Sequence, residues 1–194
     1  MINKLKKIKE KILTDTEDSL LKCVDELIEM EQERIRKQLA KDSKCLKSYN
    51  ACMKVLKNKC NKIRPILQKA KQFEDGSVVF TDGYQLYWLK DNRYNLPVHD
   101  EPNTYPNVDP LIPRTYLGEE IELPELWVVK QYVAEKTNLP LGQCLVAPKF
   151  LLNAYSILGE KLTGYYYGVN RPIKLVNKDD EIGVILPIRK EERC

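Results

Sequence analysis

The sequence contains very little of what enzymes commonly use for catalysis or metal binding. Its 194 residues include a single histidine, His99, and six cysteines with no Cys-x-x-Cys pair among them. With a single histidine, a histidine-based catalytic triad has no plausible assembly beyond that one residue. Metal sites made of Cys and His need closely spaced ligands, which the sequence lacks. A glycine-rich phosphate loop and a dinucleotide fingerprint are also missing. We therefore expect a protein that is not an enzyme, with reduced thiols and with no metal ion or cofactor.

Long apolar segments are absent as well. No run approaches the roughly 18 to 20 apolar residues that cross a bilayer, and the lysine-rich N-terminus lacks the apolar region and cleavage site of a signal peptide. The composition, 43% hydrophobic and 31% charged, is typical of a globular chain in water. We expect one compact domain with an appendage, in the cytoplasm.

Acidic residues are missing from one particular stretch, residues 43–73, which holds nine basic side chains and no acidic one. Residues 1–42 balance ten basic with ten acidic side chains, and residues 74–194 hold thirteen basic and eighteen acidic ones. All of the excess positive charge, +4 over the chain, therefore lies in residues 43–73. Such a local concentration attracts polyanions.

A helix is predicted in that basic stretch, over Tyr49 to Cys60, followed at Arg64 to Leu67 by the start of a strand. One set of positions recurs at helical spacing and is expected to face a sheet: Cys52, Val55, Leu56, Cys60 and Ile63. Another face is polar and is expected in solvent: Lys47, Asn50, Lys54, Lys57 and Asn61. Such a face either binds a polyanion or simply keeps an exposed helix soluble, and both interpretations stay open.

Residues 77–90, SVVFTDGYQLYWLK, combine strand-forming residues with one polar turn. Val78 to Phe80 and Tyr84 to Leu89 are rich in β-branched and aromatic residues, and Asp82-Gly83 supplies the turn. We predict a hairpin or a kinked strand. Asp82 is expected to accept hydrogen bonds from backbone amides in the turn rather than to act as a catalytic acid.

Several segments, taken in order along the chain, resemble the bacterial replicative sliding clamp, the β subunit of the chromosomal DNA polymerase. They are Tyr49 to Cys60 with Arg64-Pro65-Ile66-Leu67, Thr81-Asp82-Gly83-x-x-Leu86, Tyr105 to Pro113, Lys149 to Ala154, and Arg171-Pro172-Ile173 with Ile185 to Arg189. The resemblance covers about residues 48–190, which is one clamp repeat rather than the three of a full subunit. It implies an α+β fold with two helices packed on an antiparallel sheet, and helices that meet duplex DNA through its phosphates without reading bases.

Charge and resemblance together predict a DNA-binding set of residues. Its members are Lys47, Asn50, Lys54, Lys57, Lys59, Lys62, Arg64 and Lys149. Only Lys149 comes from the second clamp-like helix, Pro148 to Leu158. We interpret the protein as a non-enzymatic accessory factor of phage or mobile-element origin that contacts duplex DNA and associates with further copies or with replication proteins. A clamp-fold module that binds protein partners without DNA is the alternative.

Three further regions carry predictions of their own. Residues 1–43 are predicted to form a helical arm ahead of a domain over residues 44–194. In that arm a basic amphipathic segment spans Ile2 to Ile12, where contact with DNA or a membrane surface stays open. A second helix, Ser19 to Ala40, is predicted to carry an approximate heptad seam of Leu21, Val24, Ile28, Ile35 and Leu39, interrupted by Glu31, which suits a hairpin, self-association or packing on the domain.

The other two regions lie within the domain. Leu96 to Pro113 is predicted to be an extended loop because of its prolines. Pro124 to Thr137 favours a helix over a strand. Two acidic runs are expected to be solvated at turns: Glu119, Glu120 and Glu122, and Asp179, Asp180 and Glu181.

Overall fold

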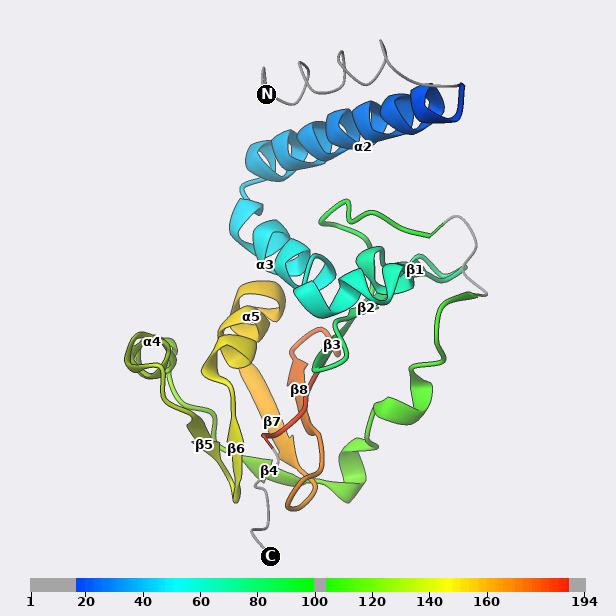
Figure 1. The fold of residues 1–194 in the computed structure, drawn as a ribbon. Coiled ribbons are helices and arrows are strands. Elements are labelled where there is room, and N and C mark those ends of the chain that lie inside the picture. The colour runs from blue at the N-terminus through cyan, green and yellow to red at the C-terminus, as the bar shows by residue number, and fades with distance from the viewer. Residues whose placement is uncertain (1–16, 100–103, 189–194) are drawn as a thin grey trace, which may run out of the picture. The chain divides into compact units, whose positions relative to one another are not determined.

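A computed structural model describes residues 17–99 and 104–188 of the chain (Figure 1). The chain divides into two units, Met1–Leu46 and Lys47–Cys194. The first unit contains helix α2 (Glu17–Asp42), which confirms the long helix predicted there. The predicted amphipathic segment Ile2 to Ile12 lies outside the described residues.

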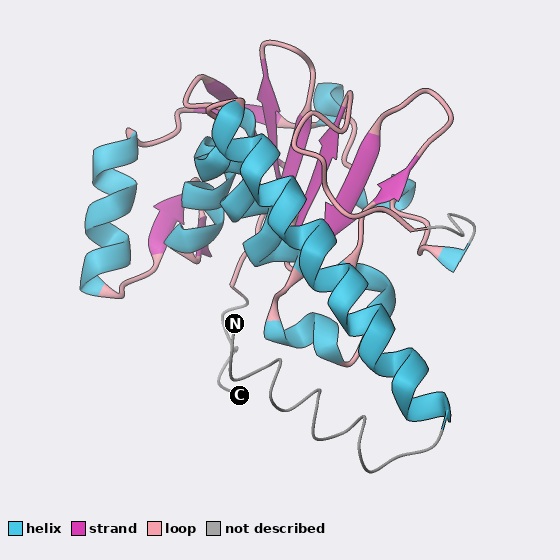
Figure 2. Cartoon of the chain, turned by 90° about the horizontal axis from the view of Figure 1, so that it is seen from above, coloured by secondary structure: helices cyan, strands magenta, loops and turns pink. Residues whose placement is uncertain are grey.

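The second unit is built on a seven-stranded antiparallel sheet, as the resemblance implied. The strand order is β1-β2-β3-β9-β8-β7-β4, so the middle of the chain pairs directly with its end. Figure 2 shows the strands side by side. Their bounds are β1 (Lys71–Gln72), β2 (Val78–Thr81), β3 (Gln85–Leu89), β4 (Glu119–Ile121), β7 (Leu162–Tyr166), β8 (Ile173–Asn177) and β9 (Ile182–Ile185).

The predicted hairpin is confirmed as β2 and β3. Val78 pairs with Leu89 and Thr81 with Leu86, so the turn between the strands is Asp82-Gly83-Tyr84. Gly83 has a φ of +86°, a conformation that residues with a side chain rarely adopt. The strands are buried on both faces, which explains their almost continuous apolar sequence. The hairpin therefore belongs to the core of the sheet.

Two helices pack on this sheet, α3 (Leu46–Leu56) and α5 (Pro148–Leu158). They lie next to one another, since residues of both line a single small pocket. Helix α5 contacts β8 and β9, and a Cβ added at Gly183 would lie 3.1 Å from the Leu158 side chain. Helix α3 buries its apolar side completely at Cys52, Val55 and Leu56. The predicted α+β fold with two packed helices is thus confirmed.

The helical register predicted beyond Leu56, with Cys60 and Ile63 facing the sheet and Asn61 in solvent, is wrong. A short 3₁₀ helix, η1 (Lys59–Lys62), follows α3, and Asn58 caps it by accepting a hydrogen bond from the Cys60 amide. Because a 3₁₀ helix has 3.0 rather than 3.6 residues per turn, the following side chains change face. Ile63 is 88% exposed, Cys60 is exposed and Asn61 is fully buried, the reverse of the prediction.

A second correction concerns the segment after η1. Arg64 to Leu67 does not begin a strand, because Pro65–Gln68 forms another 3₁₀ helix, η2, and β1 starts only at Lys71. Proline at its first position has the φ of a helix start and no amide hydrogen to leave unpaired. The chain therefore reaches the sheet edge through two short turns.

The helix predicted at Pro124 to Thr137 is confirmed as α4 (Leu126–Glu135). Lys136 ends it in the left-handed conformation, with φ +56°. A separate two-stranded ladder follows, β5 (Leu139–Leu141) with β6 (Cys144–Val146). Within the described part of Leu96 to Pro113, 3₁₀ turns at Thr104 and at Asp109–Leu111 interrupt an otherwise extended path.

A buried ion pair ties the loop after β3 to the turn between β8 and β9. The Arg93 guanidinium donates to both carboxylate oxygens of Glu181, at 2.5 and 2.6 Å, and Asn177 Nδ2 donates to one of them at 2.8 Å. The Glu181 side chain is 0% exposed and that of Arg93 is 37% exposed. The prediction that Glu181 is solvated is therefore wrong, whereas its neighbours Asp179 and Asp180 are exposed.

This ion pair predicts a loss of stability in acid. Burial alone would raise the pKa of Glu181, but hydrogen bonds from Arg93 and Asn177 outweigh it and hold the pKa below the ordinary value of 4.5. A depressed folded-state pKa stabilises the protein above the unfolded-state pKa, and that contribution disappears as the pH falls through the folded-state value. We expect the gap in unfolding free energy between wild type and Glu181→Gln, measured in urea, to be constant above about pH 6 and to narrow below pH 4.5. A gap independent of pH would contradict this account.

Candidate nucleic-acid interface

The eight residues predicted to bind DNA are all exposed. We call them the basic face: Lys47, Asn50, Lys54, Lys57, Lys59, Lys62, Arg64 and Lys149. The first three lie on one side of α3 and Lys57 directly follows its last residue, so the four span about 15 Å at 1.5 Å per residue. The opposite side of α3 is anchored in the core. The structure thus exposes every predicted side chain, and the packing of α3 in the core holds the backbone of that helix in place.

The segment after α3 is held by a buried asparagine rather than by apolar side chains. Asn61 Nδ2 donates to the carbonyl oxygens of Val55, Leu56 and Leu67 at 3.0–3.1 Å. These bonds satisfy carbonyls at the end of α3, which a helix otherwise leaves unpaired. Asn61 is therefore a structural residue, and the lysines at 59 and 62 are carried on a turn that it fixes.

The turn at Asp82 joins the two helices of the candidate interface. Asp82 is 2% exposed, and its Oδ2 accepts hydrogen bonds from Asn58 Nδ2 at 2.6 Å and Gln85 Nε2 at 3.0 Å. Its Oδ1 accepts from the amides of Tyr84 and Gln85, both at 3.0 Å. Gln85 Oε1 in turn accepts from Asn153 Nδ2 of α5 at 3.3 Å. The carboxylate is fully engaged in holding the loop after α3 and helix α5 around the hairpin.

Two basic side chains lie near this turn. A Cβ added at Gly83 would be 3.8 Å from Arg64 Nη1, so the guanidinium lies against the turn. Lys149 Nζ lies 5.2 Å from the Phe150 ring centroid, and that ring stacks on Tyr84 at 6.3 Å. The structure therefore brings Arg64 and Lys149 to one turn although 85 positions separate them in the sequence.

Tyr84 is the residue of this surface that sequence reasoning missed. The sequence pattern predicts a strand from Tyr84 to Leu89, yet β3 begins only at Gln85, and Tyr84 is 49% exposed. Half-exposed aromatic rings beside lysines suit contact with a sugar-phosphate chain or with an apolar partner. Its position directly after the turn glycine, Gly83, is the sequence signal from which its exposure could have been predicted.

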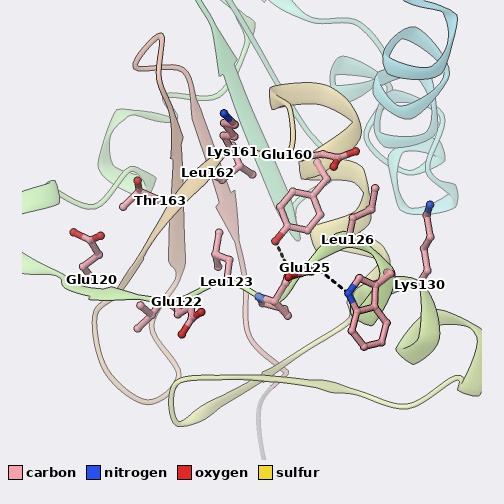
Figure 3. A pocket seen from close by; sticks show the side chains of 14 residues that line it. Glu120, Glu122, Leu123, Glu125, Leu126, Lys130, Glu160, Lys161, Leu162 and Thr163 are labelled. Atoms are coloured by element: carbon pink, nitrogen blue, oxygen red, sulfur yellow. Dashed lines mark hydrogen bonds between the residues drawn. The ribbon is translucent and has the colours of Figure 1, made fainter.

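The second unit also has a hollow that is mainly acidic, in contrast to the basic face (Figure 3). This cavity of about 960 Å³ lies where β4, the start of α4 and the start of β7 meet. Four glutamates line it against two lysines: Glu120, Glu122, Glu125 and Glu160, with Lys130 and Lys161. The hollow is therefore unsuited to a phosphate chain.

The aromatic residues of this hollow are tied to its walls. Trp127 Nε1 donates to Glu125 at 2.6 Å, and Tyr155 donates to the Pro124 carbonyl at 2.6 Å, as the dashed lines in Figure 3 show. Burial, and then the charge of Glu160, raise the pKa of Tyr155 to about 12, so its hydroxyl stays a donor at neutral pH. Among residues 17–99 and 104–188, no three His, Cys, Asp or Glu side chains are placed to hold a metal ion. No helix in those ranges is long and apolar enough to cross a membrane.

Comparison with known proteins identifies the architecture. No family model and no curated protein sequence matches the chain. Among solved structures, the beta chain of DNA polymerase III from Streptococcus pneumoniae TIGR4 matches 76% of this chain with a TM-score of 0.54 and 14% identity. The beta subunit of DNA polymerase from Streptococcus pyogenes matches 76% with a TM-score of 0.52 and 12% identity. The fold is that of a bacterial sliding clamp.

The clamp fold accounts for the order of motifs seen in the sequence. The matches span 63% and 64% of the two streptococcal chains, less than two thirds of their length. At 12–14% identity the likeness establishes the fold alone. The surface residues of this chain itself therefore determine what it binds.

Proposed function

We propose that this protein is a non-enzymatic, DNA-associated accessory protein with a clamp fold, which contacts the duplex phosphate backbone through the basic face. One observation carries the proposal: seven exposed lysine and arginine side chains gather on α3, η1, the following turn and the start of α5. No acidic residue interrupts residues 43–73. A face of this kind holds a polyanion close without needing a pocket.

The chemistry of the face favours phosphates over base edges. Six of its seven cations are lysines, which act as mobile point charges, whereas base readout relies on fixed bidentate groups. Arg64, the one arginine, lies against the Gly83 turn. Binding should therefore be independent of DNA sequence and weak for a single copy.

Association of several copies would add such weak contacts together. The two outer strands of the sheet are short, and their charges are opposite: β1 carries Lys71, and β4 carries Glu119 and Glu120. An outer strand with unpaired backbone groups can extend a sheet from one copy into the next, although directly before β1 the Ala70 amide and carbonyl already bond Pro97 and His99. Opposite charges favour a head-to-tail arrangement, in which β1 of one copy meets β4 of another.

The test is duplex-DNA binding measured across salt, with the mass in solution measured in the same buffers. We expect log K to fall linearly with log salt at about −0.9 per phosphate contact, and two unrelated duplexes to bind within about twofold of each other. Absence of salt-dependent affinity even at low ionic strength, together with a monomeric mass, would overturn the proposal.

A second candidate is a clamp-fold module that binds protein partners instead of DNA. Three large apolar side chains near the hairpin turn are exposed: Tyr84 at 49%, Leu186 at 39% and Ile188 at 37%. The Leu186 amide donates to the Tyr84 carbonyl at 2.9 Å, which joins these two residues, and the Ile188 amide donates to the Leu145 carbonyl of β6 at 2.7 Å. A negative DNA result would make this apolar surface the better candidate.

A further inference from the structure

Helix α2 exposes an apolar stripe that Glu31 interrupts. Its side chains are spaced by three, four, seven and four residues, close to multiples of the 3.5-residue period of a coiled coil. The exposed fractions are 63% for Leu21, 49% for Val24, 50% for Ile28, 49% for Ile35 and 45% for Leu39. Solvated apolar rows of this length mark an interaction surface.

The other side of α2 is already covered. Cys23 is 3% and Ala40 is 1% exposed, and Leu27 and Met30 are half-buried. At 3.6 residues per turn these residues lie opposite the stripe. The stripe is thus additional to the side of this helix that is already buried.

The charges of α2 are segregated along its length. From Glu17 to Glu33 there are seven acidic residues and one basic residue, and from Arg34 to Asp42 there are four basic residues and one acidic residue. The boundary is marked by a bidentate contact within the helix, between Glu31 and Arg34. The helix is therefore negative over its first 17 residues and positive over its last 9.

We propose that two copies of this chain dimerise through α2 as an antiparallel helix pair. An antiparallel pair centred near residue 30 places the acidic residues among 17–26 of each helix against the basic residues among 34–42 of the other, whereas a parallel pair would place like charges together. The stripe is nearly symmetric about residue 30. Leu21 of one copy would therefore lie opposite Leu39 of the second copy, and Val24 opposite Ile35.

The chain's own N-terminal residues do not suffice as the occupant. The stripe from Leu21 to Leu39 is about 27 Å long, whereas a helix over residues 1–13 would reach only about 20 Å at 1.5 Å per residue. Those residues contain five lysines and one glutamate, so they could complement only the acidic part of α2. A second copy complements both parts.

Site-directed cross-linking tests the proposal without DNA. The full chain is prepared with Cys45, Cys60 and Cys194 changed to serine, and then with either Leu21→Cys or Leu39→Cys. One of the two proteins carries a tag so that the mixed disulfide can be separated by mass. After mild oxidation of an equimolar mixture, we expect the mixed disulfide to exceed either self-linked dimer by at least about tenfold, as an antiparallel pair requires.

A matched control measures accidental collisions. Leu117 is 66% exposed on the second unit, so Leu117→Cys mixed with Leu21→Cys should give only background cross-linking. Self-linked Leu21→Cys dimers in excess would overturn the antiparallel arrangement. A monomeric mass at 100 μM with background cross-linking would overturn dimerisation through α2 altogether, and circular dichroism of each variant would confirm that the helices are formed.

Discussion

Replacing Lys54 and Lys57 by glutamate together is expected to weaken duplex-DNA binding by about 100-fold at low salt. Each substitution removes one cation from the middle of the basic face and adds one repelling carboxylate. The slope of log K against log salt should also become shallower by about 2, because roughly one counterion-releasing contact is lost per lysine. The measurement is a fluorescence-anisotropy titration at several salt concentrations with two unrelated duplexes.

The fold should tolerate this double change. Both lysines are exposed, on the side of α3 away from the buried Cys52 and Val55. Surface substitutions of this kind usually shift the unfolding free energy by less than about 0.5 kcal/mol. A loss of DNA affinity can therefore be assigned to charge rather than to unfolding.

The matched control reverses the same amount of charge elsewhere. Lys130→Glu with Lys161→Glu changes the net charge equally, but these lysines line the acidic hollow of Figure 3. We expect this control to weaken binding by less than about threefold, through long-range repulsion only. Equal losses in both double variants would mean that overall charge, not the basic face, governs binding. If binding survives Lys54→Glu with Lys57→Glu, the lysines of residues 4–11 become the better candidates.

Replacing Arg93 by methionine is expected to destabilise the protein by about 2–3 kcal/mol. The change leaves the Glu181 carboxylate, whose side chain is 0% exposed, without its cation. Breaking a fully buried pair costs about 3–5 kcal/mol, and the lower figure reflects the partial access of water to Arg93. Urea unfolding at pH 7 measures the difference.

Two further variants separate charge from packing. Arg93→Met combined with Glu181→Met should regain most of the lost stability, because no charge is then left buried without a partner. Arg34→Met removes the cation of the exposed Glu31 pair and should leave the unfolding transition unchanged within error. A wild-type transition in Arg93→Met would show that Glu181 is satisfied without the arginine.

Local sequence patterns predicted the elements well. The bounds of α5 follow directly from Pro148 and Gly159, a proline suited to a first helical turn and a glycine with a φ of +98° after the last one. The β2–β3 hairpin followed from two apolar runs around Asp82-Gly83. Both depend on residues within one or two turns of each other, which is the range that periodicity and turn chemistry report.

Errors arose where a distant residue decides the environment. Periodicity placed Asn61 in solvent, yet its amide is buried because it bonds the Leu67 carbonyl and those at the end of α3. Charge placed Glu181 in solvent, yet Arg93, 88 positions earlier, holds it inside. From the sequence alone, a buried polar residue cannot be told from an exposed one, because the partner that satisfies it is distant in the chain.

The sequence by itself determined the helices, the hairpin, the clamp-like order of motifs and the concentration of basic charge in residues 43–73. These depend on composition, spacing and short-range turn chemistry. Only the tertiary structure decided that β3 pairs with β9 and that the Asp82 turn joins Asn58 to Gln85. It also decided that Arg64 and Lys149 lie near one turn. The strand pairing and the contacts at the turn depend on residues far apart in the chain, which come together only when the sheet is assembled.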